Sequence, residues 1–478
     1  MKRCPMKGIH FTSKRGTEYY YDDLTGQIFP AKQTELSMLA EKFRNLAPDR
    51  KLLDFHNIRN AGEEELKDYL CKGANGFKQL LLEITSFCNL RCRYCIYSDH
   101  YEFTKTYENK HMDFSVAKAA IDYYFSNFRN IQYRNPTRNP VIGFYGGEPL
   151  LNLQLIRQIV EYIKMTYGEY DGIQYNITTN GISFTEDVQD FLTENNFSII
   201  VSLDGYKENH DRNRVKADGT GSFDEVMKNL KTFRERHKGY SKLAISSCYD
   251  IKTDMFQLRD FFDSEDLFLA RLASVDANNT TYYDQFTPHE KQKFSESLAS
   301  LKEIFLNLTE SNKIRKDSFL YSLIGMNYSE LAFHPMMNEK RPDLLPFTAS
   351  CIPGEKIYVT IDGNYHMCEK INTHHAIGNI EQGIDYGKIA CIINNFKKSV
   401  CQNCTDCNVT RFCNICFQQC ATDHNFEKKD SMCANIEAHV KAILADFIDV
   451  LETNPTLFEE ITIDYYKSIY EKVGVILE

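Results

Sequence analysis

The sequence predicts an α/β fold in which a parallel sheet is built from strand–helix–strand crossovers. Six apolar runs of strand length alternate with helical patterns between residues 79 and 275, which is the arrangement that crossover connections produce. Two groups of chemically distinctive residues follow the first two runs, and ligands of parallel sheets gather at those carboxyl ends. The alternation alone fits either an open doubly wound sheet or a partly closed barrel.

Periodicity assigns the elements in chain order. The expected strands of the sheet are 79–84, 141–145, 173–178, 198–203, 242–247 and 267–275, and the expected helices between them are 115–128, 153–167, 186–195, 222–236 and 255–262. Before the sheet, 16–29 has the pattern of a hairpin, and helical patterns lie around 34–46 and 63–71. Residues 280–345 are expected to form helices and connecting loop, and a helical pattern resumes at 434.

Composition limits the possible function classes. The length of 478 residues predicts two to four structural units. The net charge of −10 argues against a nucleic-acid partner, because neutralising phosphates requires a basic surface. The chain has no apolar run of membrane-spanning length and no secretory signal in its first ten residues, so we expect a cytoplasmic protein without membrane contact. Its sixteen cysteines are then expected to be thiols or metal ligands instead of disulfides.

Three cysteines follow the first expected strand, in Cys88-Asn-Leu-Arg-Cys92-Arg-Tyr-Cys95. A short loop of this kind can place three thiolates on three irons of a cubane and leave the fourth iron open for a small molecule. A zinc site would usually add a fourth protein ligand and a second cysteine pair, and a bacterial ferredoxin run has a different spacing and a final proline. The spacing after a strand therefore favours an open cluster over zinc, a ferredoxin run or incidental cysteines.

This loop resembles the signature of the radical S-adenosylmethionine (SAM) superfamily, with Tyr94 at its aromatic position. The resemblance implies a partial (β/α)6 barrel of the TIM type. It also implies a [4Fe–4S] cluster on Cys88, Cys92 and Cys95 whose open iron chelates the amino and carboxylate groups of SAM. An electron from a donor such as flavodoxin or ferredoxin would then cleave SAM to a 5′-deoxyadenosyl radical, so the hard chemistry belongs to the cofactor.

Polar residues after the later strands resemble the SAM contacts of that family. Gly146-Gly147-Glu148-Pro149 resembles the GGEP motif, in which glycines allow close backbone approach and the glutamate accepts hydrogen bonds from the amino group. Each single polar residue has an ordinary turn or cap role as its alternative. The full set of expected SAM contacts is Tyr94, Gly146, Gly147, Glu148, Pro149, Thr179, Asn180, Ser202, Asp204 and Arg214, the last for the carboxylate of SAM.

Nine cysteines in the C-terminal part resemble the SPASM domain, which carries two auxiliary [4Fe–4S] clusters in peptide-modifying enzymes; one zinc would use only four of them. Matched by position, Cys351 and Cys368 resemble ligands of the first auxiliary cluster, and Cys404, Cys407, Cys413 and Cys433 resemble ligands of the second. The usual third ligand of the first cluster is Phe417 here, so the flanking Cys416 and Cys420 are candidates, singly or together. If only one of them binds, an iron stays open for a substrate thiolate.

The other cysteines have no clear place in this pattern. Cys401 is a spare thiol or an alternative to Cys404. We expect Cys4, Cys71, Cys248 and Cys391 to be core or surface thiols, because each stands alone.

The N-terminal pattern resembles the small winged-helix-like module with which maturases of ribosomal peptides recognise a leader peptide, by adding it as a strand to a sheet edge. An oligomerising or stabilising extension is the alternative. The expected organisation is a leader-recognition module at 1–76, a radical SAM barrel at 77–280, a helical bridge at 281–348, a SPASM domain at 349–435 and C-terminal helices at 436–478.

Together these resemblances imply a maturase with three [4Fe–4S] clusters that acts on a precursor peptide and forms cysteine thioethers, as sactipeptide and ranthipeptide enzymes do. The runner-up is a formylglycine-forming sulfatase maturase. In that family an aspartate base follows the cysteine aligned with Cys368, whereas this chain has Glu369. A third possible function is the formation of carbon–carbon crosslinks in a peptide. A non-enzymatic electron carrier would explain the cysteines but not the GGEP-like turn.

Overall fold

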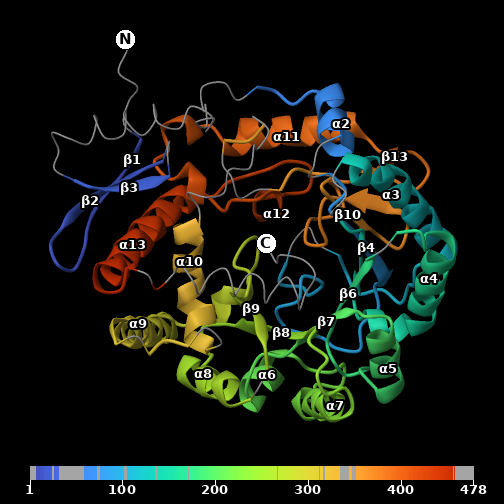
Figure 1. Ribbon diagram of the computed structural model, residues 1–478, viewed down its shortest axis with the longest axis horizontal. Helices are drawn as coiled ribbons and strands as arrows, with labels where there is room; N and C mark the ends of the chain where they lie inside the picture. Colours follow the sequence, from blue (N-terminus) through green and yellow to red (C-terminus); the bar gives the residue numbers. More distant parts are fainter. Residues whose placement is uncertain are drawn as a thin grey trace.

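Six parallel strands form the centre of the molecule and confirm the predicted α/β barrel. They are β4 (Gln79–Thr85), β5 (Val141–Gly146), β6 (Gln174–Thr179), β7 (Ser198–Ser202), β8 (Leu243–Tyr249) and β9 (Leu269–Ser274). Strands that follow one another in the chain are also neighbours in the sheet, and the connecting helices lie outside their arc (Figure 1). This is a partly closed barrel and not a doubly wound sheet, which would carry helices on both faces.

The computed structural model describes residues 7–23, 26–31, 59–72, 76–101, 105–134, 138–170, 172–265, 267–311, 313–315, 318–333, 344–346, 351–455 and 457. The helices around the barrel are α3 (Phe114–Arg134), α4 (Leu153–Thr166), α5 (Glu186–Glu194), α6 (Lys207–Asn213), α7 (Phe223–Arg236) and α8 (Met255–Ser264). The predicted elements of this region agree with these bounds to within a few residues, except that α6 was not foreseen.

The register of the strands determines which side chains face the barrel lumen. Glu83 pairs with Tyr145, Ser202 with Ser246, and Ser246 with Arg271. Paired residues of neighbouring strands point to the same face of a sheet. Residues of the opposite face, such as Leu82, Ile142 and Phe144, are completely buried against the helices, so the main core lies between sheet and helices.

The barrel sheet continues into the C-terminal part of the chain. β10 (Lys356–Val359) pairs parallel with β4, and β11 (Asn364–His366), β12 (Gly378–Asn379) and β13 (Gly383–Ile384) follow antiparallel. The helices of this part are α11 (Tyr386–Val400) and the short α12 (Phe417–Cys420). The expected boundary at 348/349 therefore does not interrupt the sheet, and the domain limits themselves stay predictions.

The N-terminal sheet has one strand more than the predicted hairpin. β2 (Glu18–Asp22) and β3 (Gln27–Pro30) form the hairpin, and β1 (Gly8–Thr12) pairs antiparallel with β2. Helix α2 (Glu63–Lys72) appears as predicted but packs against α11, where Asn394 exchanges hydrogen bonds with the backbone of Ala61. The helix expected at 34–46 lies outside the described residues, so the winged-helix-like arrangement stays a prediction.

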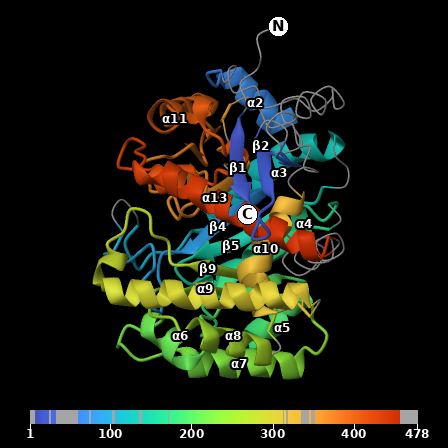
Figure 2. The same cartoon turned by 90° about the vertical axis from the view of Figure 1, so that its left-hand side faces the viewer.

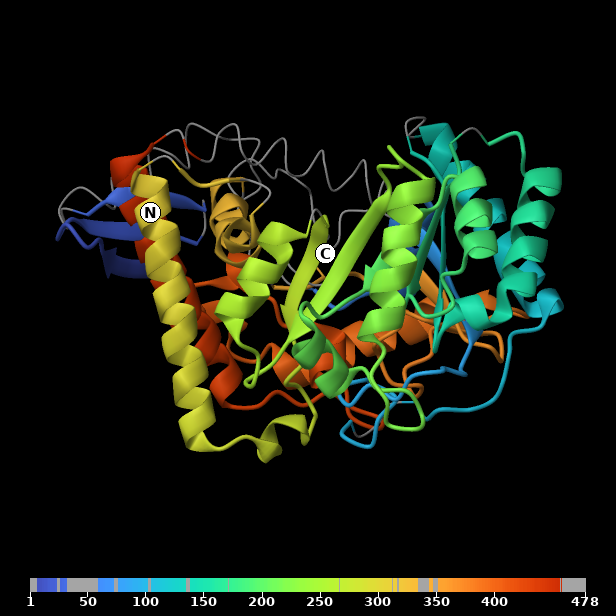
Figure 3. The same cartoon turned by 90° about the horizontal axis from the view of Figure 1, so that it is seen from below.

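Three helices connect the N-terminal sheet to the barrel. α13 (Ser431–Thr453) packs against β1, and α9 (Pro288–Glu310) and α10 (Met326–Phe333) pack against α13 (Figures 2 and 3). Lys302 on α9 and Asp446 on α13 form an ion pair of 2.7 Å. No helix within the described ranges is both long enough and apolar enough to cross a membrane.

The carboxylate of Asp23 anchors the N-terminal sheet to the cysteine-rich segment. Asp23 is completely buried and accepts hydrogen bonds from the backbone N–H of Thr410 at 3.0 Å, the backbone N–H of Arg411 at 3.1 Å and the hydroxyl of Tyr21 at 3.1 Å. The hydroxyl of Thr410 is a further donor. Burial raises the pKa of Asp23, and these donors oppose that rise, so the carboxylate joins two segments far apart in sequence.

We expect Asp23→Ala to loosen β1–β3 without disturbing the barrel. The substitution leaves buried donors of Thr410 and Arg411 without an acceptor, which costs about 2 kcal/mol or roughly 30-fold in local opening. Hydrogen–deuterium exchange measures this as faster exchange of the amides of β1–β3, with β5–β8 unchanged. Asp187→Ala on the exposed face of α5 is the control. Equal exchange in Asp23→Ala and the parent protein would show that Asp23 does not hold the sheet.

Candidate active site

The cysteine loop follows β4 and is held in place by a second segment of the chain. The backbone N–H of Arg91 donates to the carbonyl of Val215 at 2.7 Å, and that of Arg93 donates to the carbonyl of Asn213 at 3.0 Å. Cys88 is 8% exposed. Its sulfur accepts from the backbone N–H of Leu90 at 3.4 Å and from the Asn180 side-chain amide at 3.8 Å.

The loop suits thiolate ligands of an iron–sulfur cluster. Burial raises the pKa of Cys88 to about 12 and also raises the pKa of Cys92 and Cys95, so a bound cation is needed to keep all three deprotonated. Across the part of the chain that is described, no three Cys, His, Asp or Glu side chains converge on a single ion. A cubane takes one thiolate on each iron, so its thiolates lie farther apart than three ligands of a single ion do. The donors to Cys88 are the hydrogen bonds that tune such sulfurs.

The two glycines after β5 are needed for contact with the cysteine loop. A Cβ on Gly146, whose φ is +127°, would lie 2.3 Å from the carbonyl oxygen of Thr85, and one on Gly147 would lie 2.3 Å from that of Phe87. The backbone N–H groups of Gly147 and Glu148 donate to these same carbonyls at 2.7 and 2.9 Å. The two glycines therefore allow a close contact between protein backbones, and their expected contact with SAM stays a prediction.

Glu148 is a buried carboxylate that ties the ends of β5 and β6 together. It accepts from the backbone N–H of Leu150 at 3.1 Å, the hydroxyl of Thr179 at 2.7 Å and the backbone N–H of Asn180 at 2.7 Å. Burial raises the pKa of Glu148 to about 7 despite these donors. The Asn180 side chain also donates to Asn89 at 2.7 Å. Thr179 and Asn180, expected to contact SAM, therefore also support Glu148 and the cysteine loop.

Asp204 holds Tyr94 and Arg214 through one buried carboxylate. The hydroxyl of Tyr94 and Nε of Arg214, the latter at 2.9 Å, donate to one oxygen, and the backbone N–H of Cys248 donates to the other at 3.0 Å. The Arg214 guanidinium also lies 5.4 Å from the centre of the Tyr94 ring. Asp204 was expected to contact SAM itself. Its carboxylate accepts three protein donors and positions Tyr94 and Arg214, and its contact with SAM stays a prediction.

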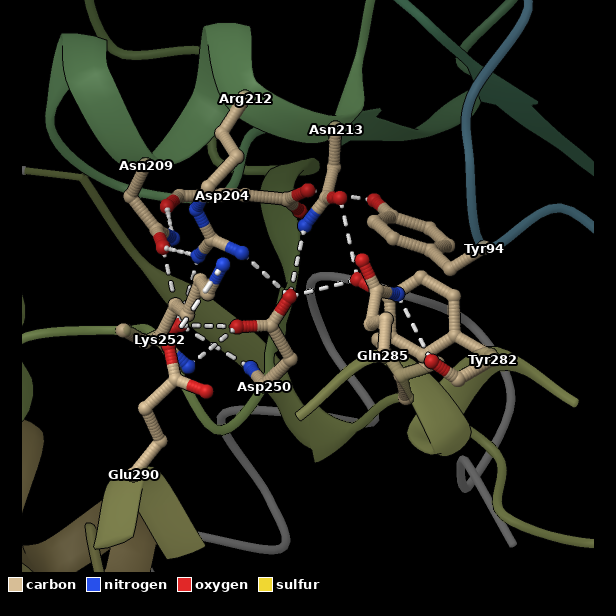
Figure 4. A network of polar contacts seen from close by, with 12 residues as sticks. Tyr94, Asp204, Asn209, Arg212, Asn213, Asp250, Lys252, Tyr282, Gln285 and Glu290 are labelled. Carbon is tan, nitrogen blue, oxygen red and sulfur yellow. Dashed lines mark hydrogen bonds and ion pairs between the residues drawn. The ribbon is translucent and has the colours of Figure 1, made fainter. Parts of the chain in front are cut away.

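A neighbouring polar network extends from Asp204 to the segment after β9 (Figure 4). The carboxylate of Asp250 accepts from Arg212 at 2.5 Å, from the Asn213 amide at 3.0 Å and from the Tyr282 hydroxyl at 2.5 Å. Tyr282 begins the short helix η3 (Tyr282–Gln285), and its ring meets that of Tyr94 edge to face at 6.5 Å. The network therefore links the cysteine loop to three further chain segments.

The C-terminal cysteines gather in two groups. Burial raises the pKa of Cys368, and Cys416 lies near enough to raise it further, while Cys351 and Cys368 both lie near Lys356. In the second group the thiol of Cys401 donates to Cys404. The remaining members of the second group, each within electrostatic reach of at least one other, are Cys407, Cys413 and Cys433.

The positions of these cysteines bear on three ligand assignments that the sequence leaves open. Cys416 lies near Cys368, which favours it over Cys420 as the further ligand of the first set. Cys420 is completely buried and lies within reach of both Cys416 and Cys433. Cys401 joins the second set instead of standing apart. All of these ligand assignments stay predictions.

Several residues at the barrel mouth were missed from the sequence. The carboxylate of Glu83 on β4 pairs with Lys105 at 2.9 Å and accepts from the Tyr97 hydroxyl at 3.1 Å. Cys248, expected to be an ordinary core or surface thiol, lies at the end of β8 beside Asp204. Arg271 projects from β9 on the lumen face. A charged side chain inside an otherwise apolar strand was the available signal for Glu83 and Arg271.

Comparison with known proteins identifies the barrel. Residues 82–245 match the family model described as the radical SAM superfamily. The chain contains a radical SAM domain. A domain of this family implies a [4Fe–4S] cluster that binds SAM, and Cys88, Cys92 and Cys95 are the residues that would hold it. When bound, such a cluster supplies the electron that cleaves SAM.

Curated relatives of the radical SAM domain include sulfatase-maturating enzymes and a cyclopropyl synthase. A cysteine-type anaerobic sulfatase-maturating enzyme of Clostridium novyi (strain NT) is 30% identical over 202 residues, which are 42% of this chain and 52% of that protein. The radical SAM cyclopropyl synthase TigE of Paramaledivibacter caminithermalis is 28% identical over 166 residues, 34% of this chain and 33% of its own. The chain spans about half the length of the first curated relatives it matches.

Solved structures share the fold over a larger part of the chain. Histidine-tagged anSMEcpe with bound AdoMet superposes with a TM-score of 0.57 at 18% identity, covering 83% of this chain and 98% of the other. Native anSMEcpe with bound AdoMet and Cp18Cys peptide gives 0.56 at 18% identity, covering 81% and 99%. These structures share the overall fold of this chain.

We expect Glu148 to make SAM binding depend on pH. Because its pKa is about 7, Glu148 loses its negative charge as pH falls below 7, and it then accepts hydrogen bonds from the amino group of SAM less well. Affinity for SAM should fall about tenfold between pH 8 and pH 6. Anaerobic equilibrium titration of the reconstituted protein measures this. Glu148→Gln should bind SAM weakly at both pH values, and an unchanged pH slope in this variant would contradict the assignment.

Proposed function

We propose that this enzyme modifies a ribosomally made precursor peptide and joins a cysteine sulfur of that peptide to a carbon atom. The observation that carries the proposal is the position of the first C-terminal cysteine group (Cys351, Cys368 and Cys416) near the end of β8. Cys416 and Glu369 both lie near Lys370, and Lys370 also lies near Cys248 at the end of β8. We infer that this group lies near enough to the SAM residues to place a substrate cysteine next to an acceptor carbon.

The proposed reaction balances without an external oxidant. SAM, a peptide C–H and a peptide S–H give methionine, 5′-deoxyadenosine, a thioether and one proton. One electron enters when SAM is cleaved, and one leaves when the carbon–sulfur bond forms. The second cysteine group, from Cys401 to Cys433, offers a route for that electron toward the surface. A flavodoxin- or ferredoxin-like donor would begin the cycle.

A formylglycine-forming activity is the second candidate. Its support is the set of curated relatives named as cysteine-type and serine-type anaerobic sulfatase-maturating enzymes. Against it stands the chain's Glu369, which occupies the expected position of an aspartate base and whose carboxylate pairs with Lys356 at 2.7 Å. An ion-paired carboxylate at this position is a poorer proton acceptor than a free one.

The position of the N-terminal sheet is the feature that supports a leader-binding role. Its central strand β2 donates through Tyr19 to Glu452 on α13 at 2.8 Å, and β1 contacts the cysteine-rich segment through Asn408. A leader peptide bound at this sheet would thus be held next to the auxiliary cysteines. We propose leader recognition there on this ground.

The product of the reaction tests the proposal. Small cysteine-rich peptides encoded beside the gene should be incubated anaerobically with the reconstituted enzyme, SAM and a reductant. Thioether formation predicts a mass loss of two hydrogens, loss of one alkylatable thiol and one 5′-deoxyadenosine per crosslink. An aldehyde that reacts with hydrazine would favour the second candidate. Absence of 5′-deoxyadenosine would contradict radical SAM activity altogether.

Iron content tests the three cysteine groups separately. We expect about twelve irons per chain, and about eight in the triple variant Cys88→Ala, Cys92→Ala, Cys95→Ala, because each cubane holds four. Cys416→Ala should lower the iron content or change the spectrum of one cluster. The matched control is Cys391→Ala, an exposed thiol on α11. About four irons in the parent protein would contradict both auxiliary clusters.

A further inference from the structure

Most acidic groups at the mouth of the barrel are matched by a cation. Glu83 pairs with Lys105 at 2.9 Å and Asp204 with Arg214 at 2.9 Å. Glu369 pairs with Lys356 at 2.7 Å. The side chain of Asp276 accepts two hydrogen bonds from Asn278, at 2.9 and 2.8 Å. Buried or half-buried charges need such compensation.

Arg271 is a cation at the mouth of the barrel that no described acidic group pairs with. It lies on β9 in register with Ser246, which in turn pairs with Ser202, so all three side chains face the lumen. Its side chain is exposed there and makes no hydrogen bond or ion pair with any described group. An arginine held on a rigid strand with its donors unused is organised to bind an anion.

The neighbours of Arg271 place it over the reaction space. Burial and then Asp204 raise the pKa of Cys248, and Arg271 opposes this rise from β9. Burial and Glu369 likewise raise the pKa of Tyr145 on β5, and Arg271 again acts in the opposite direction. Arg271 is therefore within electrostatic reach of both Cys248 on β8 and Tyr145 on β5. Lys370 adds a second positive charge near Cys248.

The groups expected to bind SAM lie elsewhere on the barrel. Glu148 follows β5 and would take the amino group, and Arg214 follows α6 and would take the carboxylate. Arg271 is on the last strand of the barrel and belongs to neither set. The anion it faces is therefore expected to come from another molecule in the mouth, and in the proposed function that molecule is the peptide.

We propose that Arg271 is a specificity residue that binds a carboxylate of the peptide substrate beside the modified position. This proposal rests on the proposed function for the identity of the substrate. The planar guanidinium donates two parallel hydrogen bonds to a carboxylate, which an amide cannot accept in the same way. The carboxylate belongs either to an aspartate or glutamate side chain or to the C-terminus of the peptide.

Matched short peptides test this proposal on the reconstituted enzyme with SAM. The probes are acetyl-Ala-Cys-Ala-Ala-Asp-Ala-amide, the same peptide with Asn for Asp, and acetyl-Ala-Cys-Ala-Ala-Ala with a free C-terminus. Glutarate serves as a probe that is not a peptide. Binding is measured by anaerobic titration, and turnover by 5′-deoxyadenosine release. Arg271→Gln is compared with Arg271→Lys and with Arg129→Gln, an exposed arginine on the outer helix α3.

We expect the Asp peptide to bind at least about tenfold tighter than the Asn peptide. Arg271→Gln should abolish that preference, Arg271→Lys should keep part of it, and Arg129→Gln should leave it intact. A preference for the free C-terminus that disappears in Arg271→Gln would assign the carboxylate to the peptide end. Cluster absorbance and thermal unfolding of Arg271→Gln should match the parent protein, since no described contact is lost.

Other outcomes of the same experiment distinguish the proposed role of Arg271 from the proposed function of the enzyme. Equal binding of the Asp and Asn peptides, or a preference that survives in Arg271→Gln, would overturn the role of Arg271 and leave the peptide function standing. Weaker SAM binding in Arg271→Gln would overturn it as well, because the arginine would then serve the cofactor. Arg271-dependent binding of glutarate without binding of any peptide would support the carboxylate site and contradict the peptide substrate. Binding of none of the probes would contradict both.

Discussion

The buried ion pair between Asp204 and Arg214 holds three chain segments at the mouth of the barrel. A carboxylate without water is stable only when donors and a cation replace its hydration. Asp204 meets this demand with the Tyr94 hydroxyl, the Arg214 guanidinium and the backbone N–H of Cys248. The electrostatic cost of the charge therefore forces the cysteine loop, the segment after α6 and the end of β8 into fixed positions.

Glu148 likewise holds the other end of the cysteine loop in a fixed position. Its three donors come from the turn after β5 and the end of β6, and Asn180 connects them to Cys88 and Asn89. The loop that would carry the cluster is thus fixed near Cys88 by one buried carboxylate and near Tyr94 by another. Such preorganisation is what a site needs if reacting groups are to be held within a fraction of an ångström.

How far the sequence predicts this structure depends on the range of the interactions involved. The six barrel strands are contiguous apolar runs, and their buried faces dictate their positions locally. By contrast β1 (Gly8–Thr12) and the short strands β10–β13 owe their form to pairing with distant partners, such as β10 with β4. The extra strand and the continuous sheet could not be inferred from local pattern.

The candidate site likewise has one part that local sequence predicts and one part that depends on distant residues. The cysteine spacing located Cys88, Cys92 and Cys95 without knowledge of the fold. The protein contacts of Asp204 and the two glycines depend on what lies opposite them in space, so the sequence did not reveal them, and the contacts of these residues with SAM stay predictions.

The shared sheet also sets the relation between the two reacting regions. β10 is hydrogen-bonded along β4, the strand that leads into Cys88, and the backbone N–H of Ile361 after β10 donates to Glu83 at 3.3 Å. The chain then passes through β11 directly to Cys368. The first auxiliary cysteine group is therefore positioned by strand register, not by a flexible hinge between domains. In the proposed reaction, strand register would therefore set the distance between a substrate cysteine at that group and the barrel mouth, and the proposed role of Arg271 would add selection among substrates.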